Sequence, residues 1–146
     1  MNVKLLAIFL SALILVPPSF IQAQQQARIP RIGILSGSSA ASSSARVEAF
    51  RRRLRELGYV EGKNIFIEYR YAEGKLERLP DLAAELVRLK VDVIVTGGSP
   101  NILAAKKASA TMPIVFVGAA DPVGSGLVSS LARPGGNITG LSVMAP

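Results

Sequence analysis

Short apolar runs alternate with amphipathic segments along most of the chain. Five such runs are rich in aliphatic and β-branched side chains and are bounded by turn residues: 31–36, 65–71, 91–96, 113–118 and 138–143. Runs of this length predict buried β-strands. The run 91–96 is almost entirely β-branched, which indicates a central strand. Apolar and polar side chains alternate over 65–71, which indicates a half-exposed strand at a sheet edge.

The segments between these runs have a helical period. One apolar stripe recurs at i, i+3, i+7 and i+10, and a second at i, i+3, i+4, i+7 and i+8. They consist of Val47, Phe50, Leu54 and Leu57, and of Leu79, Leu82, Ala83, Leu86 and Val87. We predict helices over 45–57, 79–87 and 101–110, and a short one after Asp121 that contains Leu127, Val128 and Leu131. The serine-rich stretch 37–44 is predicted to be a loop.

Strands that alternate with helices of this length predict an α/β fold, in which a parallel sheet carries helices on both faces. Right-handed crossovers restrict the topology, and the flavodoxin-like strand order 2-1-3-4-5 fits the pattern. In this order strands 2 and 5 lie at the edges. We therefore predict one compact lobe over residues 28–142.

The first residues have a different composition. A short basic start, the apolar run Leu5–Val16 and the breaking residues Pro17 and Pro18 lead to Ala23, a small residue at a possible cleavage point. This order is typical of a secretory signal peptide, and the apolar run is shorter than the roughly 20 residues that span a membrane. Residues 1–23 are therefore predicted to be a cleaved signal, and an uncleaved N-terminal anchor is the alternative.

The amino-acid composition excludes several kinds of catalytic and metal-binding site. The chain contains no cysteine and no histidine, which excludes a disulfide, a thiol nucleophile, a histidine-based metal site and a Ser-His-Asp triad within it. Neither a dinucleotide-binding glycine motif nor a P-loop motif occurs, so no cofactor and no metal are predicted. The net charge is +7, and arginines cluster at 51–53 and 55 beside acidic residues. We interpret this cluster as a solvated helix face rather than a nucleic-acid site.

Candidate binding chemistry lies in three loops. In an open parallel sheet, ligands bind beyond the carboxyl ends of the strands, where loops 36–39, 96–99 and 118–121 are predicted to meet. Each loop is expected to lead into a helix N-terminus, which offers unpaired N–H donors to a carboxylate. Asp121 could then pair with an ammonium group of the same ligand. The candidate ligand-binding residues are Ser36, Ser38, Ser39, Thr96, Gly97, Gly98, Ser99, Ala119 and Asp121.

A purely structural role is open for several of these residues. Ser99 and Asp121 each precede a proline and could be helix N-caps alone. Gly97 and Gly98 could serve only a tight strand-to-helix connection. The serine stretch 36–44 could be a flexible surface loop.

Several stretches of the chain resemble the ABC-transporter substrate-binding proteins of the tryptophan/tyrosine-type family. They are residues 50–64 with 67–70, residues 79–87 with 91–98, residues 113–117 with 120–123 and 126–128, and residues 131–142 with the sequence LARPGGNITGLS. Together with the first strand, they cover nearly all of residues 31–142.

The resemblance implies the type I periplasmic-binding-protein fold, in which two lobes close on a small ligand such as an amino acid. It also implies a permease and an ATPase on separate chains, a periplasmic location, and no catalytic activity. Residues 143–146 would begin the crossover to a second lobe, so the chain is expected to contain half of the cleft. A sensory ligand-binding domain and, less in keeping with the composition, an enzyme on a doubly wound scaffold are the alternative functions.

Overall fold

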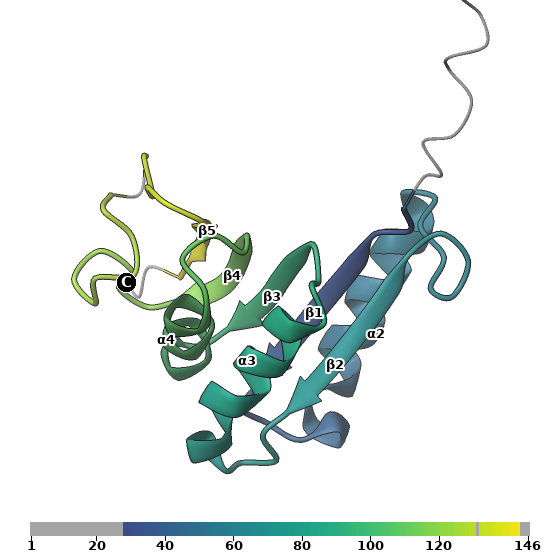
Figure 1. Ribbon diagram of the computed structural model, residues 1–146, viewed down its shortest axis with the longest axis horizontal. Helices are drawn as coiled ribbons and strands as arrows, with labels where there is room; N and C mark the ends of the chain where they lie inside the picture. Colours follow the sequence, from purple (N-terminus) through teal and green to yellow (C-terminus); the bar gives the residue numbers. More distant parts are fainter. Residues whose placement is uncertain (1–27, 131, 144–146) are drawn as a thin grey trace, which may run out of the picture.

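A parallel five-stranded sheet organises the molecule (Figure 1). The computed structural model describes residues 28–130 and 132–143, so the predicted signal segment, Leu131 and residues 144–146 lie outside the described residues. The elements in chain order are β1 (Arg31–Ser36), α2 (Ala40–Glu56), β2 (Phe66–Tyr71), the 3-10 helix η2 (Leu76–Arg78), α3 (Leu79–Arg88), β3 (Val93–Gly97), α4 (Ser99–Ala108), β4 (Ile114–Ala119) and β5 (Ile138–Ser142).

The strand order is β2-β1-β3-β4-β5 and every pair is parallel. The predicted fold class, order and edge position of the second strand are confirmed. Helices α3 and α4 cover one face of the sheet, and α2 lies against the other face over β1 and β2 (Figure 1). None of these helices is both long and apolar enough to cross a membrane.

The core lies between the sheet and helices α3 and α4. Ile94 and Ile114, on neighbouring strands, are almost fully buried there, as is Ile102 on α4. The predicted stripe of the second helix is buried at Leu79, Leu82, Ala83 and Leu86. Helix α3 begins with Pro80 in its first turn, where the missing N–H of proline costs nothing.

Leu86 reaches the sheet at Gly33 of β1. A Cβ atom at residue 33 would lie 2.9 Å from Leu86 Cδ2, so the absence of a side chain there lets α3 approach the strand closely. Burial of a leucine side chain stabilises a fold by roughly 1.5–3 kcal/mol. The contact between Leu86 and Gly33 therefore helps to fix the distance between α3 and the sheet.

The first helix begins five residues earlier than the sequence pattern predicts. Helix α2 starts at Ala40 because Ser39 is its N-cap, with the Ser39 hydroxyl accepting a hydrogen bond from the Ser42 N–H at 3.2 Å. The prediction of a loop over 37–44 is therefore wrong for 40–44. Serine is a poor helix former in the interior but a strong cap, so a run of serines conceals the start of a helix.

The predicted short helix after Asp121 is absent among the described residues. Between β4 and β5 the chain forms turns instead. The Asp121 carboxylate accepts a hydrogen bond from the Gly124 N–H at 2.8 Å and closes one of them, and glycines 124 and 126 disfavour a helix. Leu127 and Val128 are nevertheless buried in the core. The prediction of a helix over these residues is therefore wrong, although both side chains pack in the core.

The core contact of Leu86 gives a test of the fold. We expect Leu86→Ala to lower the free energy of unfolding by about 2–5 kcal/mol, because truncation leaves a cavity between α3 and β1. Leu103→Ala on α4 is the matched control, since Leu103 is exposed, and it should cost less than about 1 kcal/mol. Urea unfolding monitored by circular dichroism measures both, and equal losses would contradict this packing.

Candidate functional site

The three loops predicted to bind a ligand meet at one edge of the sheet. Strands β1, β3 and β4 are neighbours and parallel, so the segments 36–39, 96–99 and 118–121 all follow carboxyl ends on the same edge. We call these three segments the carboxyl-end rim. The backbones approach closely, because a Cβ atom at Gly97 would lie 2.7 Å from the Val117 carbonyl oxygen. The absence of a side chain at Gly97 therefore permits this contact.

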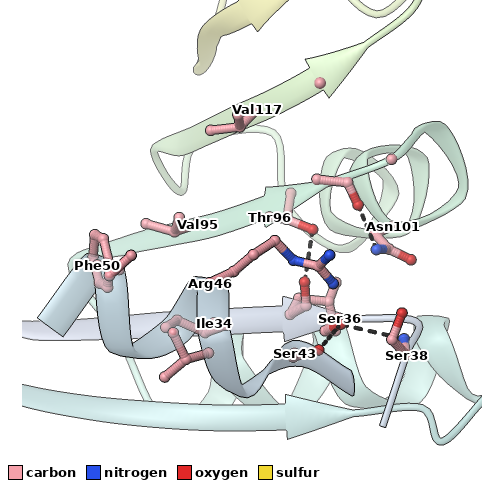
Figure 2. Close-up of a pocket in the computed structure, with 16 residues that line it drawn as sticks. Ile34, Ser36, Ser38, Ser43, Arg46, Phe50, Val95, Thr96, Asn101 and Val117 are labelled. Atoms are coloured by element: carbon pink, nitrogen blue, oxygen red, sulfur yellow. Dashed lines mark hydrogen bonds between the residues drawn. The ribbon is translucent and has the colours of Figure 1, made fainter. Parts of the chain in front are cut away.

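An open cavity of about 680 Å³ extends from the rim along the sheet face beneath α2 (Figure 2). Its rim end is lined by Ser36, Ser38, Thr96, Gly97, Gly98 and Gly118, and its other walls by Ile34, Leu35, Ser43, Arg46, Val47, Ala49, Phe50, Val95, Asn101 and Val117. The predicted residues Ser39, Ser99, Ala119 and Asp121 do not line this cavity. Ser39 and Ser99 lie at the starts of α2 and α4, Ala119 is the last residue of β4, and Asp121 is two residues beyond it, all at the same edge of the sheet.

The rim serines are hydrogen-bonded to one another. The Ser36 hydroxyl accepts a hydrogen bond from the Ser38 N–H at 3.2 Å and lies 3.2 Å from the hydroxyl of buried Ser43 on α2. Ser39 caps α2. These bonds link the β1–α2 loop to the first turn of α2, so residues 40–44 of the serine-rich stretch form the start of a helix.

The side chains of Thr96 and Ala119 face the interior. Thr96 is buried, and its hydroxyl donates a hydrogen bond to the Leu35 carbonyl oxygen at 2.9 Å, across the β1–β3 pair. Ala119 is fully buried in the core. Either residue would therefore present its backbone, not its side chain, to a ligand at the rim.

Helix α4 begins at the rim in a way the sequence pattern did not predict. Ser99 is the first residue of the helix and not its N-cap; Gly98 is the cap, with a φ of 82° that favours glycine. Pro100 follows in the first turn. Pro100 has no N–H, and the Asn101 and Ile102 N–H groups both donate hydrogen bonds to the Gly98 carbonyl oxygen at 3.1 Å. The Ser99 N–H is therefore the first-turn donor that α4 can offer to an anion.

Asn101 was missed by the sequence analysis, although it connects two parts of the rim. Its Nδ2 donates a hydrogen bond to the Gly97 carbonyl oxygen at 2.5 Å. A Cβ atom at Gly37 would lie 2.8 Å from Asn101 Oδ1, so the β1–α2 loop packs directly on this amide. A polar residue in the first turn of an alanine-rich helix was the available signal.

Arg46 and Phe50 of α2 are further cavity-lining residues that the sequence analysis did not select. Figure 2 shows Arg46 extending from α2 over the cavity. Within residues 28–130 and 132–143, its guanidinium has no carboxylate partner. Because Arg46 lies close in sequence to arginines that we interpreted as solvated, the sequence analysis did not select it as a cavity residue.

In the arginine cluster, Arg52, Arg53 and Arg55 are exposed, whereas Arg51 is half-buried. Arg51 contacts Glu48 at 2.9 Å and Glu61 at 2.8 Å, and Arg53 contacts Glu56 at 2.8 Å. The interpretation as a solvated helix face agrees with these positions. Such exposed pairs contribute little to stability.

Acidic groups lie near two parts of the rim. Asp121 is exposed and holds the turn at Gly124. The Glu73 carboxylate accepts a weak hydrogen bond from the Ala40 N–H at 3.4 Å, at the start of α2. Burial, together with the Glu73 charge, raises the pKa of Tyr71 above its ordinary value. In the described part of the chain, no three acidic side chains lie together as a metal site would require.

Of the three helix N-termini expected at the rim, the described residues form those of α2 and α4, and the third loop has no helix after it. The start of α2 is capped by Ser39 and Glu73, whereas the first turn of α4 can offer the Ser99 N–H. The rim therefore combines one helix N–H donor, glycine-rich backbone and one exposed carboxylate.

A model of the family described as "ABC transporter substrate binding protein" matches residues 31–146, which is most of the chain. The chain belongs to this family. Its members are named for binding a substrate, in keeping with a rim that offers hydrogen-bonding groups.

Comparisons with individual proteins agree with this family assignment. A tyrosine-binding protein of Clostridioides difficile (strain R20291) is 36% identical over 95 residues, which cover 65% of this chain and 28% of that protein. The solved structure of a conserved domain protein from Vibrio cholerae O1 biovar El Tor has a TM-score of 0.75 and 33% identity, and the match covers 82% of this chain and 40% of that chain. The chain therefore spans under a third of the length of its curated relative, the tyrosine-binding protein.

Two further solved structures are similar. An ABC domain in complex with L-Trp from Streptococcus pneumoniae has a TM-score of 0.70 and 28% identity, and the match covers 77% of this chain and 38% of that one. The ligand-free, open structure of a substrate binding protein with adhesive properties from Clostridium difficile has a TM-score of 0.73 and 30% identity over 80% of this chain and 40% of that one.

The N-cap of α2 yields a test of what the rim serines do. We expect Ser39→Ala to lower the free energy of unfolding by about 1 kcal/mol, because the Ser42 N–H loses its acceptor. Ser44→Ala is the control: the exposed Ser44 hydroxyl bonds to the Ala41 carbonyl inside the helix, and alanine there should be neutral or slightly stabilising. Urea denaturation measures the free energy of unfolding of both variants. An unchanged value for Ser39→Ala would show that Ser39 does not stabilise α2 as its N-cap.

Proposed function

We propose that the carboxyl-end rim binds a small amino acid-like solute as one half of a two-lobed cleft, in the solute-binding component of an ABC importer. The observation that carries the proposal is the meeting of segments 36–39, 96–99 and 118–121 at one edge of the sheet, in a member of a substrate-binding family. No bond of the solute is made or broken in this role.

The chemistry of the rim favours a zwitterion. The Ser99 N–H at the start of α4, after Gly98, suits a carboxylate. The exposed Asp121 carboxylate, on the neighbouring segment, suits an ammonium group. Two relatives support an amino acid: one is named for tyrosine, and the other was solved with L-Trp. The cavity that begins at the rim has apolar residues such as Val95 and Val117 along it, which would accept an aromatic side chain.

The chain supplies one side of such a cleft. It spans 40% or less of the solved chains it matches, and the family resemblance assigns the other side to a second lobe. An open rim cannot bury most of a ligand, so the described lobe alone should bind weakly. We propose that closure of two lobes about the strands near Leu141 and Ser142 completes the site and creates the form that a permease and its ATPase partner accept.

We further propose that residues 1–23 direct export to the periplasm. The apolar run Leu5–Val16 and the small residue Ala23 support this assignment. An exported binding protein meets solutes before they reach the membrane.

Solute binding can be tested by NMR on the ¹⁵N-labelled chain. Titration with L-tryptophan or L-tyrosine should shift the amide signals of residues 36–39, 96–99 and 118–121, with a dissociation constant of about 1 mM or weaker for half a cleft. Indole and phenol, which lack the carboxylate and the ammonium group, are the control ligands. Shifts confined to other surfaces, or equal shifts with the control ligands, would contradict the proposal.

The role of Asp121 has a sharper test. Asp121→Asn keeps an acceptor for the Gly124 N–H but removes the charge, so the turn should persist while the affinity for L-tryptophan falls about fivefold or more. The affinity for indole-3-propionate, which has no ammonium group, should be unchanged by the same substitution. The same NMR titrations measure the affinity for both ligands. An unchanged L-tryptophan affinity would show that Asp121 only stabilises the turn.

Export can be tested by N-terminal sequencing of the chain expressed in a Gram-negative host. We expect a periplasmic product that begins at Gln24. Leu10→Arg, which places a charge in the apolar run, should retain the full-length chain in the cytoplasm, whereas Asn2→Ser should have no effect. A periplasmic Leu10→Arg product would overturn the assignment.

A further inference from the structure

The positive charge of the lobe is concentrated at the edge of the sheet opposite the rim. There the strands begin and the helices end, in segments 28–31, 52–66, 88–93, 106–114 and 132–138, which we call the amino-end edge. These segments contain eleven basic and three acidic residues, whereas the rest of the described residues contain five basic and seven acidic ones. The amino-end edge is therefore strongly positive, and the remainder of the lobe is slightly negative.

Helix dipoles account for only part of this concentration. The last turns of α2, α3 and α4 each contain basic residues, which complement the negative end of the helix dipole. Lys63, Lys90 and Arg133 lie in the turns beyond the helices, so this explanation does not apply to them.

Ion pairs within the lobe neutralise little of the charge at this edge. Arg28 contacts Asp92 at 3.5 Å, and Arg53 contacts Glu56 at 2.8 Å. Most of the other basic residues there are exposed, and no salt bridge to them occurs within residues 28–130 and 132–143. They include Arg52, Arg55, Lys63, Arg88, Lys90 and Arg133. Their guanidinium and ammonium groups are available to an anionic partner.

Exposed apolar side chains lie among these charges. Leu57 is 59% exposed and Tyr59 is 43% exposed, and both lie in the α2–β2 connection between Arg55 and Lys63. Apolar side chains flanked by lysine and arginine are typical of surfaces that bind the headgroup region of an anionic membrane, where tyrosine is also favoured. A nucleic-acid duplex would satisfy the charges but would offer no apolar environment to Leu57. The combination therefore favours a membrane surface.

The polypeptide also enters the lobe at this edge. The Phe66 N–H donates a hydrogen bond to the Pro30 carbonyl oxygen at 2.9 Å, so the chain that leads into β1 lies beside the end of the α2–β2 connection. Figure 1 shows the start of β1 near the last turn of α2. Residues 1–23, which we propose to direct export across the membrane, precede this point in the sequence. The part of the lobe that follows them most closely is therefore the amino-end edge.

We infer that the amino-end edge binds an anionic phospholipid surface. Arg52, Arg55 and Lys63 lie against lipid phosphates, and Leu57 and Tyr59 enter the headgroup region. The rim, at the opposite edge of the sheet, then faces away from the membrane and stays open to solutes. The inference is independent of which solute the rim binds, so solute titrations and membrane binding can fail separately.

Sedimentation with lipid vesicles tests the inference. The protein is the chain from Gln24 onward, because the apolar run Leu5–Val16 would bind any bilayer, and the whole core lies within residues 28–143. At about 0.1 M salt, vesicles with equal parts of phosphatidylglycerol and phosphatidylcholine should bind the chain about tenfold or more tightly than pure phosphatidylcholine vesicles. Binding should be lost at about 1 M salt. Absence of binding to the phosphatidylglycerol vesicles would overturn the inference.

A pair of charge reversals locates the surface. Arg52→Glu combined with Arg55→Glu should weaken binding to the phosphatidylglycerol vesicles about tenfold or more. Lys75→Glu combined with Arg78→Glu is the matched control, since it changes the net charge equally at exposed residues between β2 and α3, near the opposite edge. It should change binding by less than about threefold. Circular dichroism checks that each variant is folded. Equal losses in the two variants would show that net charge alone drives binding, and would overturn the assignment to this edge.

The apolar contact distinguishes a membrane from another polyanion. Leu57→Ala should weaken vesicle binding about threefold or more, because less apolar surface enters the headgroup region. Leu76→Ala is the control, because Leu76 is 50% exposed but lies in η2, near the opposite edge, and its binding should be unchanged. If duplex DNA displaces the chain from the vesicles and Leu57→Ala has no effect, the edge is a general polyanion site and the assignment to a membrane is wrong.

Discussion

The close packing of α3 and α4 on one face of the parallel sheet is the constraint on which the other features depend. Leu35, Ile94 and Ile114 on the strands are nearly inaccessible beneath these helices. Burial of these apolar side chains is the main source of stability, and it holds β1, β3 and β4 side by side. Their carboxyl ends then share an edge, whatever the loops contain. The rim is a consequence of that layer.

The rim gains its shape from hydrogen bonds within its segments and between the strands that precede them. The Ser36–Ser43 hydrogen bond joins the first loop to α2, Asn101 bonds to Gly97 at the start of α4, and Thr96 links β3 to β1. Side chains that would be natural ligand contacts are thereby used to position backbone groups. A preorganised backbone site loses little entropy on binding, which suits the reversible capture of a small solute.

Helices cover the two faces of the sheet to different extents. Helices α3 and α4 cover one face, whereas on the face that carries Val117 helix α2 covers only β1 and β2. The cavity beneath α2 therefore combines two environments, a polar end at the rim and an apolar floor. We assign the polar end to the charged groups of a solute and the apolar floor to its side chain, because a few polar groups fix the orientation of a small ligand in a largely apolar pocket.

The order of strands and the burial of Leu79, Leu82 and Leu86 could be predicted from sequence, because periodicity reports which side of an element is apolar and crossover handedness restricts the topology. The gathering of the three rim segments follows from the same rules. The start of α2 at Ala40, the capping by Gly98 and the loop after Asp121 were decided by the tertiary structure. Each depends on a hydrogen bond or backbone angle that residue type alone does not specify. The orientations of Arg46 and Asn101 depend on neighbours distant in sequence, so they could be known only once the sheet had brought those neighbours together.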